Sequence, residues 1–348
     1  MTRLNVVHVV CTDAFAGVER YVRNSALWLS ASGCRVTVVG GAEAALRPVL
    51  EDAGVAWLPG ATPAQALRSL RGVRHADVIN THMTAADAVG AVAGGLLRAP
   101  VVSTRHFAAA RGSSAAARVL GGGIRRRVAA QLAISDYVAG RIDGRSTTVR
   151  SGVQNAAAVT APRERTVLVA QRLEPEKQTR LALEAWARLR AGAGDSGRDA
   201  WRLVIAGDGS QRGQLEQLAR ELGIAGEVDF LGHRSDMDEL YRTAGALLAT
   251  TPIEAFGLAV LEAMSHGLPV VAAAAGGHLE TVGGVAGAAL FAPGDADAAA
   301  GQLARLIGDP RERVRYGDAL RERQRELFTA ERQTEGTLRL FWAVVGSR

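Results

Sequence analysis

Short runs of apolar residues recur through the first half of the chain, and a loop and an amphipathic stretch follow each of them. Runs of about four to eight apolar residues are typical of buried strands, whereas apolar residues spaced by three and four indicate helices. The runs are LNVVHVV (4–10), RVTVVGG (35–41), ADVINTH (76–82), APVVSTRH (99–106) and QLAIS (131–135). Their alternation with helical stretches predicts a parallel sheet with helices on both faces.

The same pattern starts again near Arg165. Its apolar runs are TVLVAQRL (166–173), WRLVIAGDG (201–209), EVDFLG (227–232), ALLATT (246–251) and PVVAAAA (269–275). A chain of 348 residues is too long for one comfortable core. We therefore expect an N-terminal domain over 1–157 and a C-terminal domain over 158–333, both doubly wound and Rossmann-like, facing a cleft. A last helix at about 334–348 can pack back on the first domain.

Composition and charge narrow the function classes only a little. With 48% apolar and 22% charged residues, the chain has the composition of a globular protein and not of a disordered one. The net charge of +6 suits an anionic ligand, a nucleic acid or an acidic membrane surface alike, so charge by itself indicates no nucleic-acid partner. Cys11 and Cys34 lack metal-ligand spacing and are expected to be reduced, buried thiols.

No segment is expected to direct the chain into a membrane. The run 4–10 is too short for the core of a signal peptide, and the apolar run 88–97 has about half the length that a bilayer requires. These observations predict a cytoplasmic protein.

The stretch TPIEAFGLAVLEAMSHGLPVVAAAAGG (251–277) joins an acidic loop to an apolar helix and a buried strand. Glu254 precedes the helix and Glu262 follows eight residues later, about two turns on, so both carboxylates can line one side of it. The first N–H groups of a helix lack partners within it and can seat a phosphate oxygen; here they belong to Phe256, Gly257 and Leu258. Alternatively, Glu254 caps the helix and Glu262 is a solvated surface residue.

Two cations lie on the loop of VAQRLEPEKQTRLALEAW (169–186), between a strand and a helix. Arg172 and Lys177 are five residues apart and can converge on one anion. Cations already in place would stabilise the charge that develops on a departing diphosphate. The alternative is a surface ion pair between Arg172 and Glu174 or Glu176.

The glycines of WRLVIAGDGSQRG (201–213) come close to a dinucleotide-binding fingerprint without matching it. Gly207, Gly209 and Gly213 have different spacing, and a strand and helix of the same domain precede them. This stretch therefore gives little support to a dinucleotide-dependent oxidoreductase.

In the first domain, candidate residues stand where strands end. Gly17 lies at a strand-to-helix turn, and Glu19 follows in the first helical turn, where the helix dipole favours an acid. His82 and His106 end two strands, at the edge where open α/β sheets bind ligands. His8, inside the first strand, is expected in the core.

Five arginines gather in the stretch 111–127, on a possible helix interrupted by glycines: Arg111, Arg118, Arg125, Arg126 and Arg127. A solvated helix face is one explanation. The other is peripheral contact with the inner face of a membrane.

Several of these stretches resemble glycosyltransferase family 4. They are E-x7-E with its intervening F-G pair at 254–262, R-L-x-P-E-K at 172–177, and a loop at 13–19 similar to the family's G-G-x-E. Ala16 replaces the first Gly of that loop, and Gln178 stands where a Gly is common. His82 matches the second His of the family's D-V-V-H-x-H. The resemblance covers nearly the whole chain and implies the GT-B fold.

The resemblance also implies a role for each candidate. Glu254 would hold hydroxyls of the donor sugar, and Glu262 the ribose. Arg172, Lys177 and the helix start at Phe256, Gly257 and Leu258 would stabilise the phosphates. The loop EVDFLGHRSD would lie near the base through His233 and Arg234, and His82, with His106, would contact the donor or the acceptor. The N-terminal domain would bind the acceptor and the C-terminal domain the donor.

The implied reaction is transfer of a hexose or N-acetylhexosamine from a UDP- or GDP-sugar, with retention, to a glycan, lipid or small-molecule acceptor. No cofactor and no metal ion are implied. A nucleotide-sugar epimerase of the same fold is the main alternative, followed by an oxidoreductase. A non-catalytic binding protein would carry the same binding groups.

Overall fold

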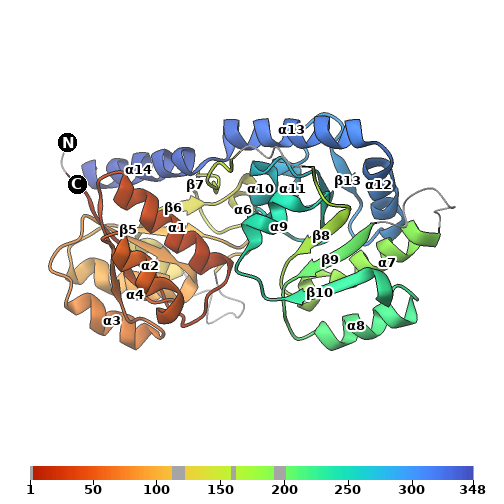
Figure 1. Ribbon diagram of the computed structural model, residues 1–348. Coiled ribbons are helices and arrows are strands. Elements are labelled where there is room, and N and C mark those ends of the chain that lie inside the picture. Colours follow the sequence, from red (N-terminus) through yellow and green to blue (C-terminus); the bar gives the residue numbers. More distant parts are fainter. Residues whose placement is uncertain (1–2, 112–121, 158–161, 192–200, 348) are drawn as a thin grey trace. The chain divides into compact units, whose positions relative to one another are not determined.

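The computed structural model describes residues 3–111, 122–157, 162–191 and 201–347, and the chain divides into two compact units (Figure 1). Unit 1 comprises Met1–Ser151 together with Ala330–Arg348, and unit 2 comprises Gly152–Thr329. The sequence analysis sets these boundaries a few residues later, at 157 and 333. Both ends of the chain thus belong to unit 1.

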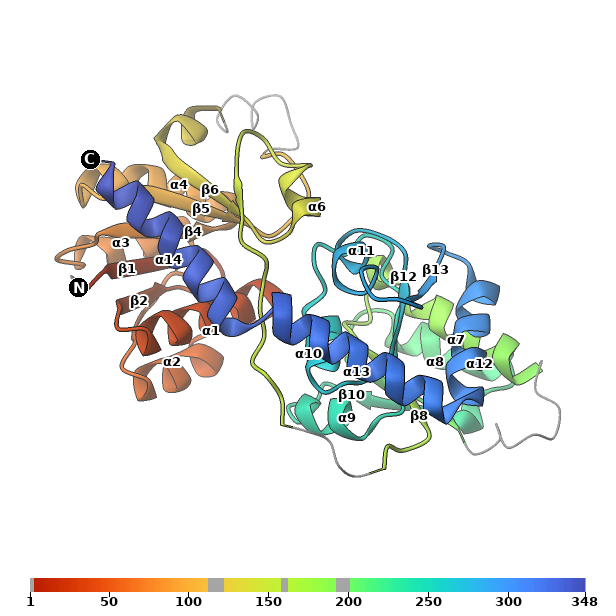
Figure 2. The same ribbon diagram turned by 90° about the horizontal axis from the view of Figure 1, so that it is seen from above.

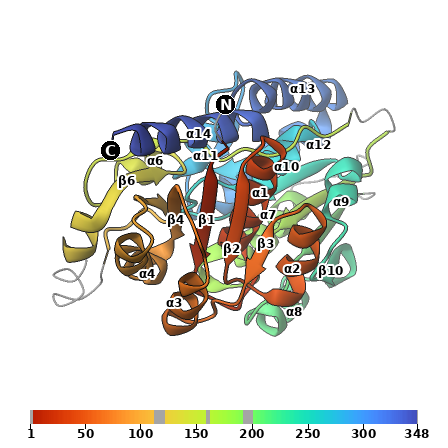
Figure 3. The same ribbon diagram turned by 90° about the vertical axis from the view of Figure 1, so that its left-hand side faces the viewer.

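Unit 1 is built on a parallel sheet in the order β3-β2-β1-β4-β5-β6-β7 (Figure 3). Its strands are β1 (Asn5–Val10), β2 (Arg35–Val39), β3 (Ala56–Leu58), β4 (Val78–His82), β5 (Val101–Arg105), β6 (Val128–Ala133) and β7 (Thr147–Thr148). Its helices are α1 (Gly17–Ala31), α2 (Glu43–Asp52), α3 (Pro63–Arg71), α4 (Met83–Leu96), α6 (Asp136–Ala139) and α14 (Ala330–Gly346). The last of these, α14, lies beside α1 (Figure 2).

Small residues let helix α4 lie close to the sheet of unit 1. A Cβ placed on Gly90 would lie 2.5 Å from Cγ2 of Thr81, so only glycine fits without movement. The core on this side joins alternate residues of β1, Val7 and Val9, to Ala86 and Val89 of α4. Strands buried on both faces read as continuous apolar runs, which explains why these strands are visible in the sequence.

Unit 2 has a six-stranded parallel sheet in the order β10-β9-β8-β11-β12-β13. Its strands are β8 (Thr166–Ala170), β9 (Arg202–Ala206), β10 (Val228–Gly232), β11 (Ala246–Ala249), β12 (Val270–Ala273) and β13 (Ala289–Phe291). Its α-helices are α7 (Thr179–Ala191), α8 (Arg212–Glu221), α9 (Met237–Thr243), α10 (Leu258–Ser265), α11 (Gly277–Thr281), α12 (Ala296–Gly308) and α13 (Pro310–Leu327). Short 3-10 helices are η1 (Pro175–Lys177) and η3 (Ala225–Glu227). In Figure 2, α12 lies beside α7, and α10 beside α13.

Each sheet reverses its strand order once. The reversal falls between β1 and β4 in unit 1, and between β8 and β11 in unit 2. Open α/β sheets bind ligands at the carboxyl ends of the strands next to such a reversal. The loops that follow these four strands are therefore where a site is expected in each unit.

Helices that could cross a membrane are not found in the described ranges, because none is both long and apolar enough.

Candidate functional site

The loop after β8 is fixed by one glutamine side chain. Nε2 of Gln171, which carries two N–H donors, lies within hydrogen-bond distance of three acceptors: the carbonyl oxygen of Lys177 at 3.0 Å, Oγ1 of Thr179 at 2.9 Å and Oγ1 of Thr250 at 3.0 Å. Thr179 begins α7 and Thr250 follows β11, and both are buried. Gln171 thus ties both ends of the loop to the neighbouring strand, which orients Lys177.

Two glycines of the G-D-G stretch, Gly207 and Gly209, pack against the backbone of this loop. A Cβ on Gly207 would lie 1.9 Å from the carbonyl oxygen of Gln171, and one on Gly209 would lie 2.5 Å from that of Leu173. Glycine is needed here for close backbone approach between β9 and the loop. The structure therefore gives these glycines a packing role.

Gln178 occupies a left-handed position, with φ 51° and ψ 43°. This explains why a glycine is common at the equivalent place in family 4, since a side chain there costs about 1–2 kcal/mol. The loop keeps its turn despite the substitution.

Lys177 and Glu254 meet in unit 2. Nζ of Lys177 lies 3.0 Å from Oε2 of Glu254, and both side chains are about one-fifth exposed, at 22% and 20%. Burial acts to raise the pKa of Glu254, but the charge of Lys177 and hydrogen bonds from Lys177 and the Phe256 N–H hold it below its usual value. The carboxylate is thus ionised beside a cation.

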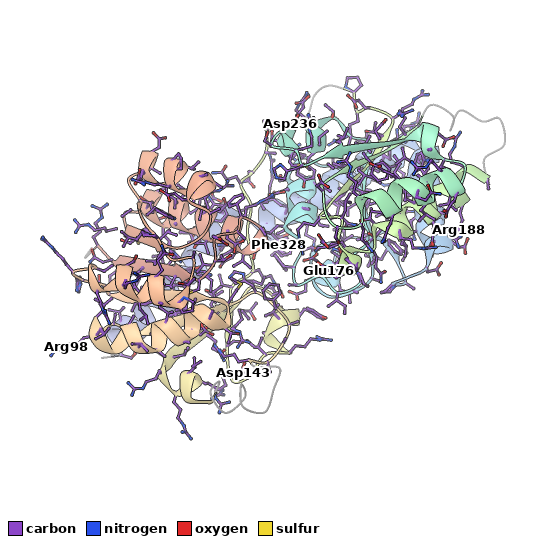
Figure 4. The ribbon with its side chains drawn as sticks, turned by 90° about the horizontal axis from the view of Figure 1, so that it is seen from below. Arg98, Asp143, Glu176, Arg188, Asp236 and Phe328 are labelled. Atoms are coloured by element: carbon purple, nitrogen blue, oxygen red, sulfur yellow. The ribbon has the colours of Figure 1, made fainter. Side chains whose placement is uncertain are left out.

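Arg172 does not join this pair. Its guanidinium donates to Oε1 of Glu176 at 2.6 Å, and both side chains are well exposed (Glu176 is labelled in Figure 4). Glu174 instead accepts from Oγ of Ser210 at 2.6 Å. Of the two surface partners considered from the sequence, Glu176 is the one found, and a bound anion would have to compete with it.

Helix α10 begins at Leu258 and is preceded by Gly257, whose φ of 94° favours glycine. Phe256 is buried and packs edge-on against Phe328 with ring centroids 5.5 Å apart (Phe328 is labelled in Figure 4). Its N–H donates to the Glu254 carboxylate. The Phe256 N–H is thus directed at the Glu254 carboxylate, and phosphate binding at Phe256, Gly257 and Leu258 stays a prediction.

A glycine pair that the sequence analysis did not single out completes this region. A Cβ on Gly276 would lie 2.2 Å from the carbonyl oxygen of Glu254, and one on Gly277 would lie 2.3 Å from Cα of Phe256. The Gly277 N–H also donates to the Glu254 carbonyl oxygen at 2.8 Å. The loop after β12 therefore fixes the acidic loop before α10 and brings His278 beside it. Two adjacent glycines shortly after a buried strand are the sequence feature that could have indicated this close approach.

Glu262 lies about one turn into α10, where Tyr241 of α9 donates its hydroxyl to Oε2 at 3.1 Å. Tyr241 is buried on α9, and its contact with Glu262, 21 residues away, cannot be read from sequence spacing. His233 and Arg234 lie on the exposed loop after β10, where Arg234 forms an ion pair with Asp236 (labelled in Figure 4). Glu262, His233 and Arg234 all lie in unit 2, as Glu254 does.

In unit 1, three histidines form a buried row across neighbouring strands. Nδ1 of His8 lies 3.0 Å from Nε2 of His82, and Nδ1 of His82 lies 2.9 Å from Nε2 of His106. Tyr21 of α1 packs edge-on against His106 with centroids 4.8 Å apart. Burial is the main cause that lowers the pKa of His8 to about 4 and of His106 to about 3, and that of His82 falls well below its usual value.

This row corrects the expected place of His82. His82 is fully buried and both of its ring nitrogens are hydrogen-bonded, so it does not face a ligand directly. His106 ends the row and is 6% exposed. Contact of His106 with a substrate stays a prediction, whereas His82 is placed to orient it. His8 lies in the core.

The turn after β1 is closed by Glu19, whose Oε2 accepts from the Ala16 N–H at 2.8 Å. Glu19 is buried, and this hydrogen bond shows that its side chain caps the start of α1. Gly17 opens α1, and a Cβ there would meet nothing within 4 Å. The space over Gly17 is therefore open among the described residues, and no neighbour in that part of unit 1 requires glycine.

Arg111 does not belong to an exposed basic patch. It is buried, and its guanidinium donates to Asp87 at 2.7 Å and to Ser103, Gln131 and Asp143 at 2.8 Å each (Asp143 is labelled in Figure 4). Arg118 lies outside the described residues. The three arginines at 125–127 are exposed. Arg111 is therefore structural, and membrane contact through the other arginines stays a prediction.

Clusters of three or more His, Cys, Asp or Glu side chains able to hold a metal ion are not found in the part of the chain that the structure describes.

Two family models match adjacent parts of the chain. The family described as "Glycosyl transferases group 1" matches residues 154–323, and "Glycosyltransferase Family 4" matches residues 15–153. The first includes the loops of unit 2 that carry Lys177, Glu254 and Glu262, and the second includes His82 and His106 of the histidine row in unit 1.

Curated relatives share part of the sequence. D-inositol 3-phosphate glycosyltransferase of Mycobacterium tuberculosis is 33% identical over 193 residues, which are 53% of this chain and 38% of that protein. MMP alpha-(1->4)-mannosyltransferase of Mycolicibacterium hassiacum is 36% identical over 170 residues, which are 48% of this chain and 40% of that protein. The matched part thus spans two-fifths or less of these relatives.

Solved structures share the fold over almost the whole chain. HepE from Anabaena, in complex with UDP and glucose, matches with a TM-score of 0.82 at 19% identity, over 98% of this chain and 100% of that one. Sucrose-phosphate synthase from Thermosynechococcus elongatus matches with a TM-score of 0.74 at 18% identity, over 99% and 100%. Together with the two parallel sheets, these matches confirm the predicted GT-B fold.

Proposed function

Because the chain belongs to the family 4 type of GT-B glycosyltransferases, we propose that it transfers a sugar from a nucleotide diphosphate to an acceptor hydroxyl with retention of configuration. The proposed donor is a UDP- or GDP-linked hexose or N-acetylhexosamine. The proposed acceptor is a glycan, a lipid or a small molecule. UDP and glucose bound in HepE support a UDP-sugar, and the mannosyl and other glycosyl transfers named for the relatives support a hexose.

The observation that carries the proposal is the Lys177–Glu254 pair at the start of α10. The cation and the helix N-terminus favour an anion, while the ionised carboxylate beside them can accept hydrogen bonds from sugar hydroxyls. A site that binds an anion beside a carboxylate that accepts hydrogen bonds from hydroxyl groups fits a sugar diphosphate, which has both a phosphate and hydroxyls.

In the proposed reaction, the bond between the anomeric carbon and the phosphate oxygen breaks as the acceptor oxygen attacks on the same face. Lys177 and Arg172 stabilise the charge that develops on the diphosphate, with Arg172 released from Glu176. Glu254 orients the sugar, and Glu262 binds the ribose. The leaving phosphate takes the acceptor's proton, so the reaction needs no separate general base.

The two rival functions of the sequence analysis are less well supported. A dinucleotide-dependent oxidoreductase needs the glycine fingerprint to cradle a pyrophosphate, whereas Gly207 and Gly209 pack against the chain's own backbone. An epimerase would release and re-add the nucleotide without an acceptor, so it would convert a nucleotide sugar in the absence of any other substrate.

The test is thermal stabilisation by UDP-, GDP-, ADP- and TDP-sugars, with and without EDTA. A ligand at 100 times its dissociation constant adds about 2.7 kcal/mol to stability. We expect one nucleotide class to raise the melting temperature with EDTA present, and Lys177→Ala and Glu262→Ala to lose the effect. Stabilisation by a nicotinamide dinucleotide alone would overturn the proposal. Product analysis with the stabilising donor then tests retention and metal independence directly.

A further inference from the structure

His278 is a buried histidine beside the candidate donor site that the mechanism above leaves without a role. It is 2% exposed and directly follows the glycine pair that contacts the loop before α10. Its Nδ1 lies 3.1 Å from the carbonyl oxygen of Ala273. Because a carbonyl oxygen only accepts hydrogen bonds, Nδ1 carries the proton of the neutral ring, and Nε2 presents a lone pair.

The Nε2 edge of His278 faces the start of α10. A Cβ placed on Gly257, the residue before the helix, would lie 3.3 Å from Cδ2 and 3.4 Å from Nε2 of His278, and 3.5 Å from Cγ of Glu254. Within the described ranges, Nε2 has no hydrogen-bond partner. The helix N-terminus thus has beside it an unpartnered nitrogen of a ring that is 2% exposed, next to a residue that has no side chain.

The charged groups that face the ring are Glu254 and Lys177. Burial lowers the pKa of His278 and Lys177 adds to this, while Glu254 and the bond to Ala273 oppose it, and the net shift is downward. The ring is therefore neutral near pH 7 without ligand. A phosphate oxygen at the start of α10 would then meet a lone pair, an arrangement of two acceptors that is unfavourable. A protonated ring would instead donate a charge-assisted hydrogen bond.

Resting on the donor site proposed above, we propose that His278 is a phosphate-binding residue that takes up one proton from solvent when the diphosphate binds. The proton adds to Nε2, and the new N–H donates to a phosphate oxygen at the start of α10. Binding is then tighter at lower pH, because the bound state holds more protons than the free state. The affinity changes by up to about tenfold per pH unit between the ligand-free and ligand-bound titrations of the ring.

Calorimetry of UDP binding to the full chain, in buffers that differ in ionisation enthalpy, counts these protons. At pH 7.5 the terminal phosphate of UDP is already ionised, since such groups titrate near pH 6. We expect net uptake approaching one proton per UDP. We also expect Kd to fall by up to about tenfold when the pH is lowered from 8 to 7.

Two variants assign the proton to His278. His278→Gln offers a neutral N–H donor near the position of Nε2, so it should bind UDP without proton uptake and with little pH dependence. His278→Asn can keep the bond to Ala273 but has no group near Nε2, so it should bind UDP more weakly at every pH. Protons exchanged by Glu254 or Lys177 would persist in both variants, and melting curves show whether each variant is folded.

UDP binding by the wild-type protein without proton uptake would overturn the His278 proposal and leave the proposed function intact. Unchanged uptake in folded His278→Gln would do the same. If UDP, GDP, ADP and TDP all fail to bind at every pH, the proposed function fails, and the role of His278 fails with it. If neither variant folds, the wild-type measurement alone decides.

Discussion

At the residue scale, the candidate site depends on polar side chains that the fold holds in one orientation. Lys177 reaches Glu254 across 77 positions of sequence, because Gln171 fixes its loop and two glycines fix the loop of its partner. Tyr241 does the same for Glu262. Residues that hold a binding side chain in place affect substrate binding and rate without touching the substrate. Variants of such residues show how much of the activity depends on positioning.

Removal of Lys177 is expected to reduce the rate of transfer far more than the stability. Lys177→Ala deletes a cation beside the proposed leaving phosphates, and loss of such a contact typically lowers kcat by about 100-fold or more. Steady-state kinetics with the identified donor measures this. Arg180→Ala, which removes an exposed cation three residues away, is the matched control and should keep full activity. Equal losses in the two variants would contradict a specific role of Lys177.

The hydroxyl of Tyr241 is expected to affect donor binding and not chemistry. Tyr241→Phe frees Glu262 from one hydrogen bond, so KM for the donor should rise several-fold while kcat changes little. The control is Tyr316→Phe, which removes a buried hydroxyl bonded to Val270 and Ala289 in the same unit. That variant should lose about 1 kcal/mol of stability with KM unchanged. A drop in kcat alone for Tyr241→Phe would argue against ribose positioning.

At the element scale, ionic and histidine groups connect the strands and helices of unit 1. Arg111 joins α4, β5, β6 and the loop at Asp143 through one guanidinium. The row His8, His82 and His106 connects β1, β4 and the end of β5. Both sets are buried, so each is sensitive to loss of a partner or to protonation.

Arg111→Ala should destabilise the protein by about 3–5 kcal/mol, because it leaves the buried carboxylate of Asp87 without its cation. Chemical denaturation measures the change in the free energy of unfolding. Arg126→Ala removes an exposed arginine from the same basic stretch and should change stability by less than about 0.5 kcal/mol. Similar small changes in both variants would show that Arg111 is not buried in an ionic network.

The histidine row is expected to make stability fall with acid. The unfolded chain binds protons at these residues near pH 6.5, whereas folding lowers the pKa of His8 to about 4 and of His106 to about 3. Their contribution is therefore complete above pH 6.5 and is lost as the pH falls toward 4. Each histidine contributes about 1.4 kcal/mol per pH unit in this range.

Denaturation at several pH values between 7 and 4.5 tests this linkage. His8→Gln should reduce the slope by about 1.4 kcal/mol per pH unit. His75→Gln is the control, because the His75 side chain is 64% exposed and the substitution leaves the buried row intact. A wild-type stability that is flat across this range would contradict the buried, neutral row.

At the scale of the whole molecule, unit 1 is built from both ends of the chain. Helix α14 belongs to it although 178 residues of unit 2 intervene (Gly152–Thr329). Phe341 of α14 is fully buried, and a Cβ on Gly336 would lie 2.9 Å from Cγ1 of Val149. Unit 1 is therefore completed only after unit 2 has been synthesised.

Truncation after Thr329 should separate the two units functionally. Loss of α14 exposes the core beside α1, so hydrogen exchange in β1 and β4 should accelerate strongly. Unit 2 keeps Lys177, Glu254 and Glu262, so UDP binding by calorimetry should persist while transfer is lost. Loss of UDP binding in a truncated protein whose unit 2 stays protected from exchange would place a donor contact in unit 1.

The sequence by itself determined the two parallel sheets, the GT-B fold and the types of residue at the donor site. Continuous apolar strands and glycine-bounded helices are local patterns, and Glu254, Lys177 and Glu262 lie in contiguous motifs. Only the tertiary structure decided that Arg172 pairs with Glu176 and that Arg111 and His82 are buried. It also decided that His278 lies beside Gly257 and that Tyr241 bonds to Glu262. These contacts depend on how closely segments that are far apart in the chain approach one another and on how deeply their side chains are buried. Neither quantity can be read from the local sequence.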